Sequence, residues 1–232
     1  MDAPAFKPQR LPDPSRHAAP QVFDELREMI ISLRLTPGTV LSRGDLQRQF
    51  GVSSTPIRDA LIRLQEEGLV EIYPQRATVV SPIDLPKARQ AQFLRRSIEQ
   101  EAVRLLAESP DRDLVRRLQA IVAGQKDLAA RQDYDGFSAS DLAFHTALFD
   151  AAGVPDLFVM MRRHSGDIDR IRRLYLPVEG KTAQIIRDHG AIVKAIAEGK
   201  PESAQRHMRD HLSRSIAQWD EMRKAFPGHF RG

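Results

Sequence analysis

Gly51-Val-Ser-Ser-Thr-Pro-Ile-Arg-Asp-Ala-Leu-Ile-Arg-Leu-Gln-Glu-Glu-Gly-Leu-Val70 is the stretch that decides the fold. It predicts a tight turn and then a helix that ends at Gly68, where a left-handed residue is favoured. Ser53, Ser54 or Thr55 can cap the helix, because a hydroxyl oxygen accepts from its free amides. One face is expected to be buried, since apolar residues recur at helical spacing at Ile57, Ala60, Leu61 and Leu64.

The opposite face of this helix carries side chains that suit nucleic-acid recognition. Thr55 and Arg58 lie on it, near the exposed N-terminal end. A small helix with hydroxyls and an arginine at this end can enter the major groove of DNA. Taken alone, the pattern also fits an ordinary amphipathic surface helix, so the flanking sequence has to decide between the two.

The sequence before this helix predicts the rest of a helix-turn-helix unit. Ser42 opens a second short helix that runs through Phe50, and Asp45 is its capping-box partner. Gly51 then provides the tight link between the two helices that such a unit requires. A further helix over about residues 21–35 completes a three-helix core.

The sequence after the helix predicts a β-hairpin. Residues 69–73 and 78–80 have the composition of two short strands, and residues 74–77 form the turn between them. Helix, turn, helix and hairpin in this order predict a winged helix-turn-helix. Arg76 is expected at the wing tip, where it can reach a phosphate or the minor groove.

The run PGTVLSRGDLQRQFGVSSTPIRDALIRLQEEGLVEIYPQRATVV resembles the N-terminal domain of GntR-type bacterial transcription regulators. The resemblance covers roughly residues 20–82 and implies that Thr55 and Arg58 contact DNA. Gly44, Ser54 and Ala77 stand where the family usually has other residues, which changes the expected operator sequence and not the fold. The candidate DNA-binding residues are Arg43, Ser53, Ser54, Thr55, Arg58 and Arg76.

The composition limits the class of protein. The chain has 232 residues, of which 28% are charged and 41% hydrophobic, as in an ordinary globular protein. It has no cysteine, which excludes disulfides, thiolate nucleophiles and cysteine metal sites. No apolar run approaches the ~20 residues that span a bilayer, and no signal-peptide core is present, so we expect a cytoplasmic protein. Residues 1–80 contain ten Lys and Arg and ten Asp and Glu, so DNA binding would depend on a local basic patch.

The pattern divides the chain into three parts. Residues 1–19, rich in proline, predict a disordered arm, and residues 20–83 predict the winged helix-turn-helix domain. Residues 84–232 predict an all-helical domain for effector binding and dimerisation, joined through a linker at residues 81–86 that Pro82 and Pro86 stiffen. The fold class is mainly α, with an N-terminal winged helix-turn-helix and a C-terminal antiparallel all-α bundle of six or seven helices. The bundle helices are expected at about residues 84–108, 111–131, 138–151, 155–176, 181–198 and 201–225.

Four side chains in the second half predict a divalent-metal site. Asp141 and His145 are four residues apart and share one helix face, although for this pair taken alone an ion pair on the bundle surface is the simpler explanation. His189 and His211 occupy core-facing positions of two further helices. Three inward imidazoles and a carboxylate suit zinc, nickel, manganese or iron. His207, one turn before His211, is an alternative ligand that helical geometry leaves open.

The second half is also similar to the all-helical, ligand-sensing C-terminal domain of FadR-type GntR regulators. The similarity covers most of residues 84–226 and is carried by Arg95–Glu99, Asp141–His145, Asp169–Leu174, Asp188-His189 and Met208–Leu212. It implies that Asp141, His145, His189 and His211 bind a divalent metal, with His211 selected over His207. It also implies that Arg95 meets the carboxylate of a small organic-acid effector, whereas a surface pair with Glu99 is the simpler interpretation of that arginine.

These patterns favour a sequence-specific DNA-binding transcription regulator, acting as a repressor and controlled by a small organic acid. An alternative from another class is a metal-dependent hydrolase or other metalloenzyme fused to a DNA-binding module, because a metal with an open position can activate water. A third interpretation makes the metal purely structural. One recognition helix reads too few base pairs for specificity, so we expect a homodimer on a palindromic double-stranded operator.

Overall fold

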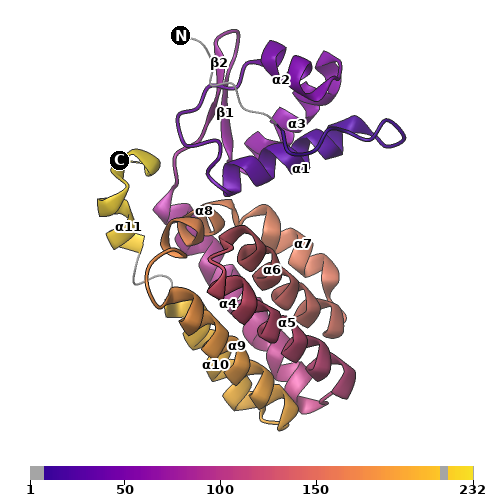
Figure 1. The fold of residues 1–232 in the computed structure, drawn as a ribbon, viewed down its shortest axis with the longest axis vertical. Coiled ribbons are helices and arrows are strands. Elements are labelled where there is room, and N and C mark those ends of the chain that lie inside the picture. Colours follow the sequence, from indigo (N-terminus) through magenta and orange to yellow (C-terminus); the bar gives the residue numbers. More distant parts are fainter. Residues whose placement is uncertain (1–7, 215–218, 232) are drawn as a thin grey trace. The chain divides into compact units, whose positions relative to one another are not determined.

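The computed structural model describes residues 8–214 and 219–231 and divides into two compact units. The first unit comprises the described residues up to Leu85 together with residues 225–231, and the second comprises the described residues from Pro86 to Lys224. Figure 1 shows the order of the elements along the chain. Within the described part of the chain, no helix is both long and apolar enough to cross a membrane.

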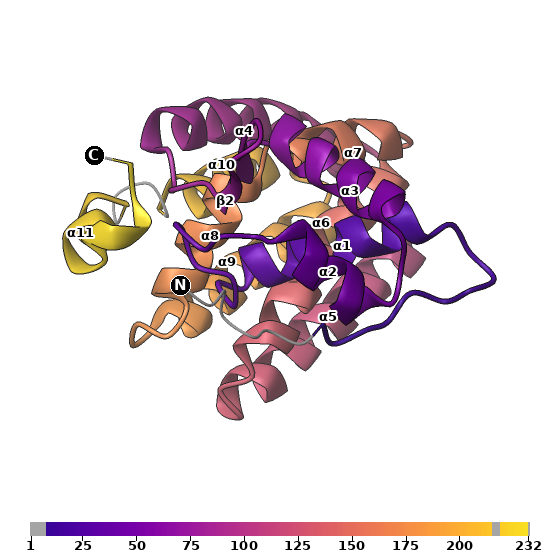
Figure 2. The ribbon, with the colours of Figure 1, turned by 90° about the horizontal axis from the view of Figure 1, so that it is seen from above.

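The first unit is the predicted three-helix core with a hairpin. Its elements are α1(Ala18–Ile31), α2(Arg43–Phe50), α3(Ser54–Glu66), β1(Val70–Tyr73) and β2(Ala77–Val80). α3 packs against both α1 and α2, and Figure 2 shows these three helices grouped together. The strands are antiparallel, with Val70 opposite Val80 and Tyr73 opposite Ala77. The core includes the four apolar residues of α3 that the sequence predicted to be buried, Ile57, Ala60, Leu61 and Leu64.

Two glycines set the helix ends of this unit as predicted. Gly51 has a φ of 66° and links α2 to α3, and Gly68 has a φ of 74° just after α3. Both angles are left-handed, a conformation that glycine adopts without a steric penalty. Ser42 caps α2 by accepting from the amide of Asp45 at 3.3 Å. Ser53 is the N-cap of α3, but its hydroxyl makes no capping hydrogen bond.

Both ends of the described chain contact the first unit. Residues 8–17 precede α1, and the amide of Gln9 donates to Glu25 Oε1 at 2.6 Å. Residues 1–7 of the predicted disordered arm lie outside the described residues. At the other end, Ile83 N–H donates to His229 O at 2.8 Å, and Phe230 is buried. The sequence had assigned residues 225–231 to the helical domain, but backbone pairing and an apolar side chain hold this segment on the first unit.

The second unit is a helical bundle, as predicted. Its helices are α4(Leu85–Glu108), α5(Arg112–Ala130), α6(Tyr134–Ala151), α7(Pro155–Arg163), α8(Gly166–Tyr175), α9(Lys181–Ala197), α10(Pro201–Arg214) and α11(Trp219–Ala225). α5 packs against α6 and α9, and α9 packs against α10. A single apolar cluster includes residues of α4, α5, α6, α9 and α10, so polar groups placed among them are shielded from water.

One predicted helix is divided in the structure. The helix expected over residues 155–176 is two helices, because Ser165 follows the end of α7 and its hydroxyl donates to Arg162 O and to Asp169. Such local side-chain bonds compete with a continuous helix. The helix expected over residues 201–225 corresponds to α10 and α11, and the segment between them lies outside the described residues. The predicted helix at 138–151 begins earlier, because Asp133 caps α6 through the amide of Gly136.

Candidate metal centre and nucleic-acid interface

The structure brings the four predicted metal-ligating side chains together inside the bundle. Asp141 and His145 come from α6, His189 from α9 and His211 from α10. One potential ligand atom of each residue lies within 4.8 Å of those of the other three. His207 is not in this group. All four side chains are buried, which excludes the surface ion pair as an explanation of Asp141 and His145.

Local packing explains why these imidazoles face inward. His189 occupies a core position of α9 between Ile185 and Ile192, and its ring stacks on Phe144 at 3.9 Å between centroids. The ring of His211 lies 4.7 Å from that of His189. Apolar residues at helical spacing turn one face of each helix toward the core of the bundle. The histidines lie on the same faces, so their rings meet inside the bundle.

The nitrogens that face the centre of this group have no hydrogen-bond partner among the described residues. His145 Nε2 and His189 Nε2 are both buried and unpaired. The nearest carboxylate atoms are those of Asp141, at 3.8 Å from His145 Nε2 and 3.7 Å from His189 Nε2. A buried polar atom without a partner costs about 1–3 kcal/mol, so this arrangement is unfavourable unless something binds the lone pairs. Neutral imidazoles and a carboxylate fit a divalent ion in that position.

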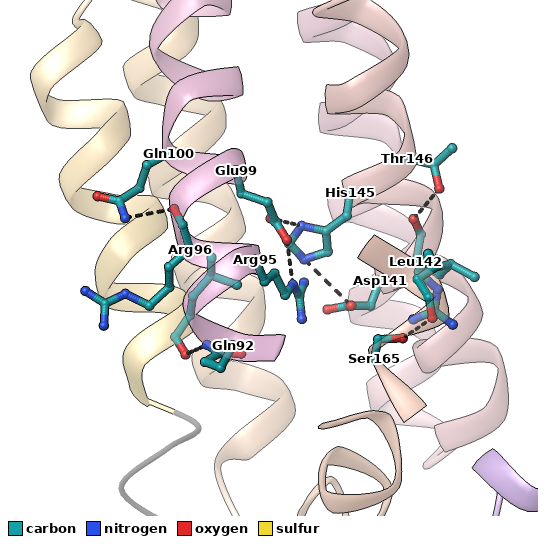
Figure 3. Close-up of polar contacts among 12 residues, drawn as sticks. Gln92, Arg95, Arg96, Glu99, Gln100, Asp141, Leu142, His145, Thr146 and Ser165 are labelled. Carbon is teal, nitrogen blue, oxygen red and sulfur yellow. Dashed lines mark hydrogen bonds and ion pairs between the residues drawn. The ribbon is translucent and has the colours of Figure 1, made fainter. Parts of the chain in front are cut away.

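The outer nitrogens of the imidazoles face acceptors. His145 Nδ1 lies 2.6 Å from Glu99 Oε2, and His189 Nδ1 lies 2.9 Å from Gln125 Oε1. Figure 3 shows His145 between Glu99 on one side and Asp141 on the other. An acceptor at Nδ1 favours the tautomer with its proton there and leaves Nε2 free to bind a metal.

Sequence reasoning named Glu99 only as a surface partner of Arg95 and assigned no role to Gln125, although the positions of both residues carried a signal. Gln125 continues the buried stripe of α5 that contains Leu118 and Val122. Glu99 likewise is fully buried on α4, four residues before Val103. A polar residue in an apolar helical stripe indicates a buried partner. The partner could be identified only once the helices were packed.

Arg95 is placed beside the metal group. Its Nε lies 2.5 Å from Glu99 Oε1, and both side chains are buried. The simpler interpretation of Arg95 was therefore correct about its partner and wrong about the surface location. Although burial raises the pKa of Glu99, Arg95 and His145 outweigh it and lower that pKa to about 2. Glu99 is thus an anion that holds an arginine and a histidine together.

Arg172 on α8 is a further cation at the centre that the sequence did not assign. Its guanidinium lies 2.6 Å from Asp141 Oδ1. Burial raises the pKa of Asp141, but Arg172 and the neighbouring imidazoles hold it well below its usual range. Burial lowers the pKa of both His189 and His211. The group therefore consists of an ionised carboxylate and, at neutral pH, uncharged His189 and His211 imidazoles, which is the form that binds metal.

A pocket adjoins this centre through His211. The charged and metal-group residues that line it are Arg95, Arg172, Lys181, Asp188, His211 and Arg214. Asp188 on α9 lies 3.6 Å from His211 Nδ1 and 2.5 Å from Arg214. A small molecule in this pocket would contact Arg95 and the metal group together.

The candidate DNA-binding side chains are all exposed on the first unit. They are Arg43, Ser53, Ser54, Thr55, Arg58 and Arg76. The side chain of Arg58 is 61% exposed, and its Nε lies 3.5 Å from Asp59 Oδ1. Arg76 lies in the turn between β1 and β2, next to Gln75, whose φ is 56°. These positions leave the side chains accessible to a nucleic acid.

The chain matches two family models. Residues 18–80 match the bacterial regulatory proteins of the gntR family, and residues 91–214 match the FCD domain. The HTH-type transcriptional regulator in an unstable DNA locus of Streptomyces ambofaciens is 35% identical over 82% of this chain and 80% of its own. The HTH-type transcriptional repressor RspR of Escherichia coli is 28% identical over 86% of this chain and 88% of its own. The solved structure of E. coli McbR/YncC has a TM-score of 0.77 at 19% identity, covers 89% of this chain and 98% of its own, and shows the same fold.

Proposed function

The chain belongs to the GntR family of DNA-binding transcription regulators and contains an FCD domain. We propose that it is a repressor whose binding to operator DNA is weakened or strengthened by a small organic acid. The acid would bind in the bundle, between a divalent metal ion and Arg95. Like its relatives, the chain is a transcription regulator and not an enzyme. The alternative of a metal-dependent hydrolase is therefore not favoured.

The observation that best supports a bound metal ion is that the Nε2 atoms of His145 and His189, beside Asp141, are buried and have no hydrogen-bond partner among the described residues. Asp141, His145, His189 and His211 would hold the ion, which could be zinc, nickel, manganese or iron. When bound, the ion supplies a positive charge and coordination positions for a carboxylate oxygen. Glu99 and Gln125 keep the two imidazoles in the tautomer that binds it.

Arg95 is the residue we propose as the second anchor of the acid. A guanidinium offers paired N–H donors in a fixed fork, which matches a carboxylate. Glu99 occupies Nε of Arg95 and so fixes the direction of the side chain, which lines the pocket. Because α4 begins directly after the linker, an acid held by Arg95 would bias the helix that leads to the DNA-binding unit.

For the DNA-binding unit we propose base and phosphate contacts through Thr55, Arg58 and the other exposed residues named above. One recognition helix contacts only a few base pairs, which gives too little specificity among genomic competitors. We therefore propose a homodimer on a palindromic operator, acting in the cytoplasm.

Two measurements on the full-length protein test this proposal. Elemental analysis of protein purified without chelator should find one divalent ion per chain. Fluorescence anisotropy with the promoter of the protein's own gene should show operator binding that changes when an organic acid is added. Absence of metal both after purification and after reconstitution would overturn the metal site. Binding that no acid in a broad panel changes would overturn effector control.

A further inference from the structure

We infer that the effector carries at least two anionic groups, and that Lys181 at the start of α9 binds the second one. This inference rests on the proposed function, because it concerns the same pocket. The second group can be a carboxylate or a phosphate, since an ammonium is a compact cation that accepts either. The effector class is thus a dicarboxylic acid or a phosphorylated acid.

The charges around the pocket are paired in all but one case. Arg95 lies against Glu99, Arg172 against Asp141, and Arg214 against Asp188. Each of these three cations already has a carboxylate within 2.6 Å. Lys181 is the fourth cation of the pocket lining, and its ammonium forms no ion pair with a carboxylate of the described residues.

The position of Lys181 favours an anion at its side. Its side chain is half-buried, so its charge is less screened by water than that of a fully exposed lysine. Gly180, the N-cap of α9, has a φ of 80° and no side chain to cap the helix. The amides of a helix N-terminus carry a partial positive charge, which adds to that of the lysine. No acidic residue occupies the first turn of α9 to offset this charge.

The net charge of the pocket lining and of a bound metal ion indicates how many anionic groups the effector carries. The three pairs are neutral, so Lys181 leaves the site one positive charge in excess. A divalent ion held by the four ligands would add two more. A monocarboxylate neutralises only one of these charges, whereas a dianion neutralises two, with one group for the metal and Arg95 and the other for Lys181. Complementary charge raises both the affinity for a small anion and its rate of association.

The test compares matched acids on the metal-loaded, full-length protein by isothermal titration calorimetry. Each acid with two anionic groups (a dianion, or a trianion for 3-phosphoglycerate) is paired with a monoanion that lacks the second group: succinate with succinamate, glutarate with glutaramate, and 3-phosphoglycerate with glycerate. We expect at least one dianion to bind roughly tenfold or more tightly than its partner, as one charge-assisted contact provides. The first two pairs test a second carboxylate, and the third tests a phosphate.

Lys181→Gln then tests the residue. We expect it to weaken binding of the preferred dianion by roughly tenfold to a hundredfold and to leave the matched monoanion almost unchanged. Lys181→Arg should keep the preference. Lys194→Gln is the control, because Lys194 lies on the same helix, is exposed and pairs with Glu198. Circular dichroism and metal content of each variant confirm that the bundle is intact.

Three outcomes would overturn the inference. Monoanions that bind as tightly as their matched dianions would show that the pocket does not select a second charge. Equal weakening of both members of a pair by Lys181→Gln would show that the lysine acts on the pocket in general. If no acid of either charge binds, the proposed effector control itself fails. The first two outcomes leave the proposed function standing, so the failures are distinguishable.

Discussion

The two units of this protein place their functional residues in opposite ways. In the first unit, the candidate DNA contacts are exposed and lie in one continuous stretch of helix and hairpin, with Arg43 and Arg76 at its flanks. In the second, the metal group is buried and its members come from three helices, of which α6 is separated in the sequence from α9 and α10 by α7 and α8. An exposed arginine can be replaced with little effect on its own unit. A buried histidine depends on its neighbours, so a substitution there should affect several properties together.

The largest expected effect is that of His189→Ala. It removes a proposed ligand that is fully buried and stacked on Phe144, so metal content should fall to a small fraction of the wild-type value. Operator binding without effector should persist, because the substitution does not touch the DNA-binding residues. His164→Ala is the control, since His164 is exposed at the end of α7. Wild-type metal content in His189→Ala, measured by elemental analysis, would remove His189 from the site.

Glu99→Gln should have the next largest effect. The amide cannot hold Arg95 and His145 with the same charge, so metal affinity should fall about 10–100-fold, as for other residues behind metal ligands. Competition with a metal-chelating dye measures this change. Glu101→Gln on the same helix is the control, because Glu101 is at the surface and pairs with Arg104. Equal affinities in the two variants would contradict a role for Glu99 in orienting His145.

Arg58→Ala tests whether the exposed residues of the first unit bind DNA independently of the metal group. If Arg58 contacts a base edge, specific operator binding should weaken by ~1–3 kcal/mol, with metal content unchanged. Anisotropy titrations on operator and random duplexes over a range of salt distinguish base from phosphate contact. A contact to phosphate alone would weaken binding evenly on both duplexes and reduce the salt slope. Unchanged affinity on both would exclude Arg58 from the interface.

The smallest effect concerns pH and the metal-free bundle. Burial lowers the pKa of His189 and His211 below the ordinary value of 6.5, whereas the unfolded chain regains that value. The unfolded state therefore binds more protons below pH 6.5, and stability should fall as the pH falls through that range. Urea unfolding of chelator-treated protein should show a lower midpoint at pH 5.5 than at pH 7.5. A midpoint that is equal or higher at pH 5.5 would contradict the burial of neutral imidazoles.

The same comparison explains what the sequence could predict. The first unit was predictable because its signals are local: Gly51, Gly68 and the apolar face of α3 determine the fold within one short stretch. In the second unit, the inward histidines were predictable from helical spacing, because the same period that buries Ile192 also buries His189. Sequence spacing could not predict that Arg172 contacts Asp141, that Gln125 contacts His189, or that the pair of Arg95 and Glu99 is buried. Each of these contacts depends on which helices become neighbours. The break at Ser165 was missed although Gly166 adjoins it, because the hydrogen bonds of the Ser165 hydroxyl to Arg162 O and Asp169 appear only in the structure.

Whether Arg95 connects the effector to DNA is the central claim, and the operator affinity of Arg95→Ala with and without the acid tests it most directly. Wild-type protein should change its operator affinity by about 5–150-fold when the acid saturates it, a coupling of ~1–3 kcal/mol. Arg95→Ala should keep its metal and its operator affinity without acid, and should show no change when the acid is added. Arg95→Lys serves as a second variant, because it retains the charge beside Glu99 without the paired donors. A full wild-type response in Arg95→Ala would contradict the account.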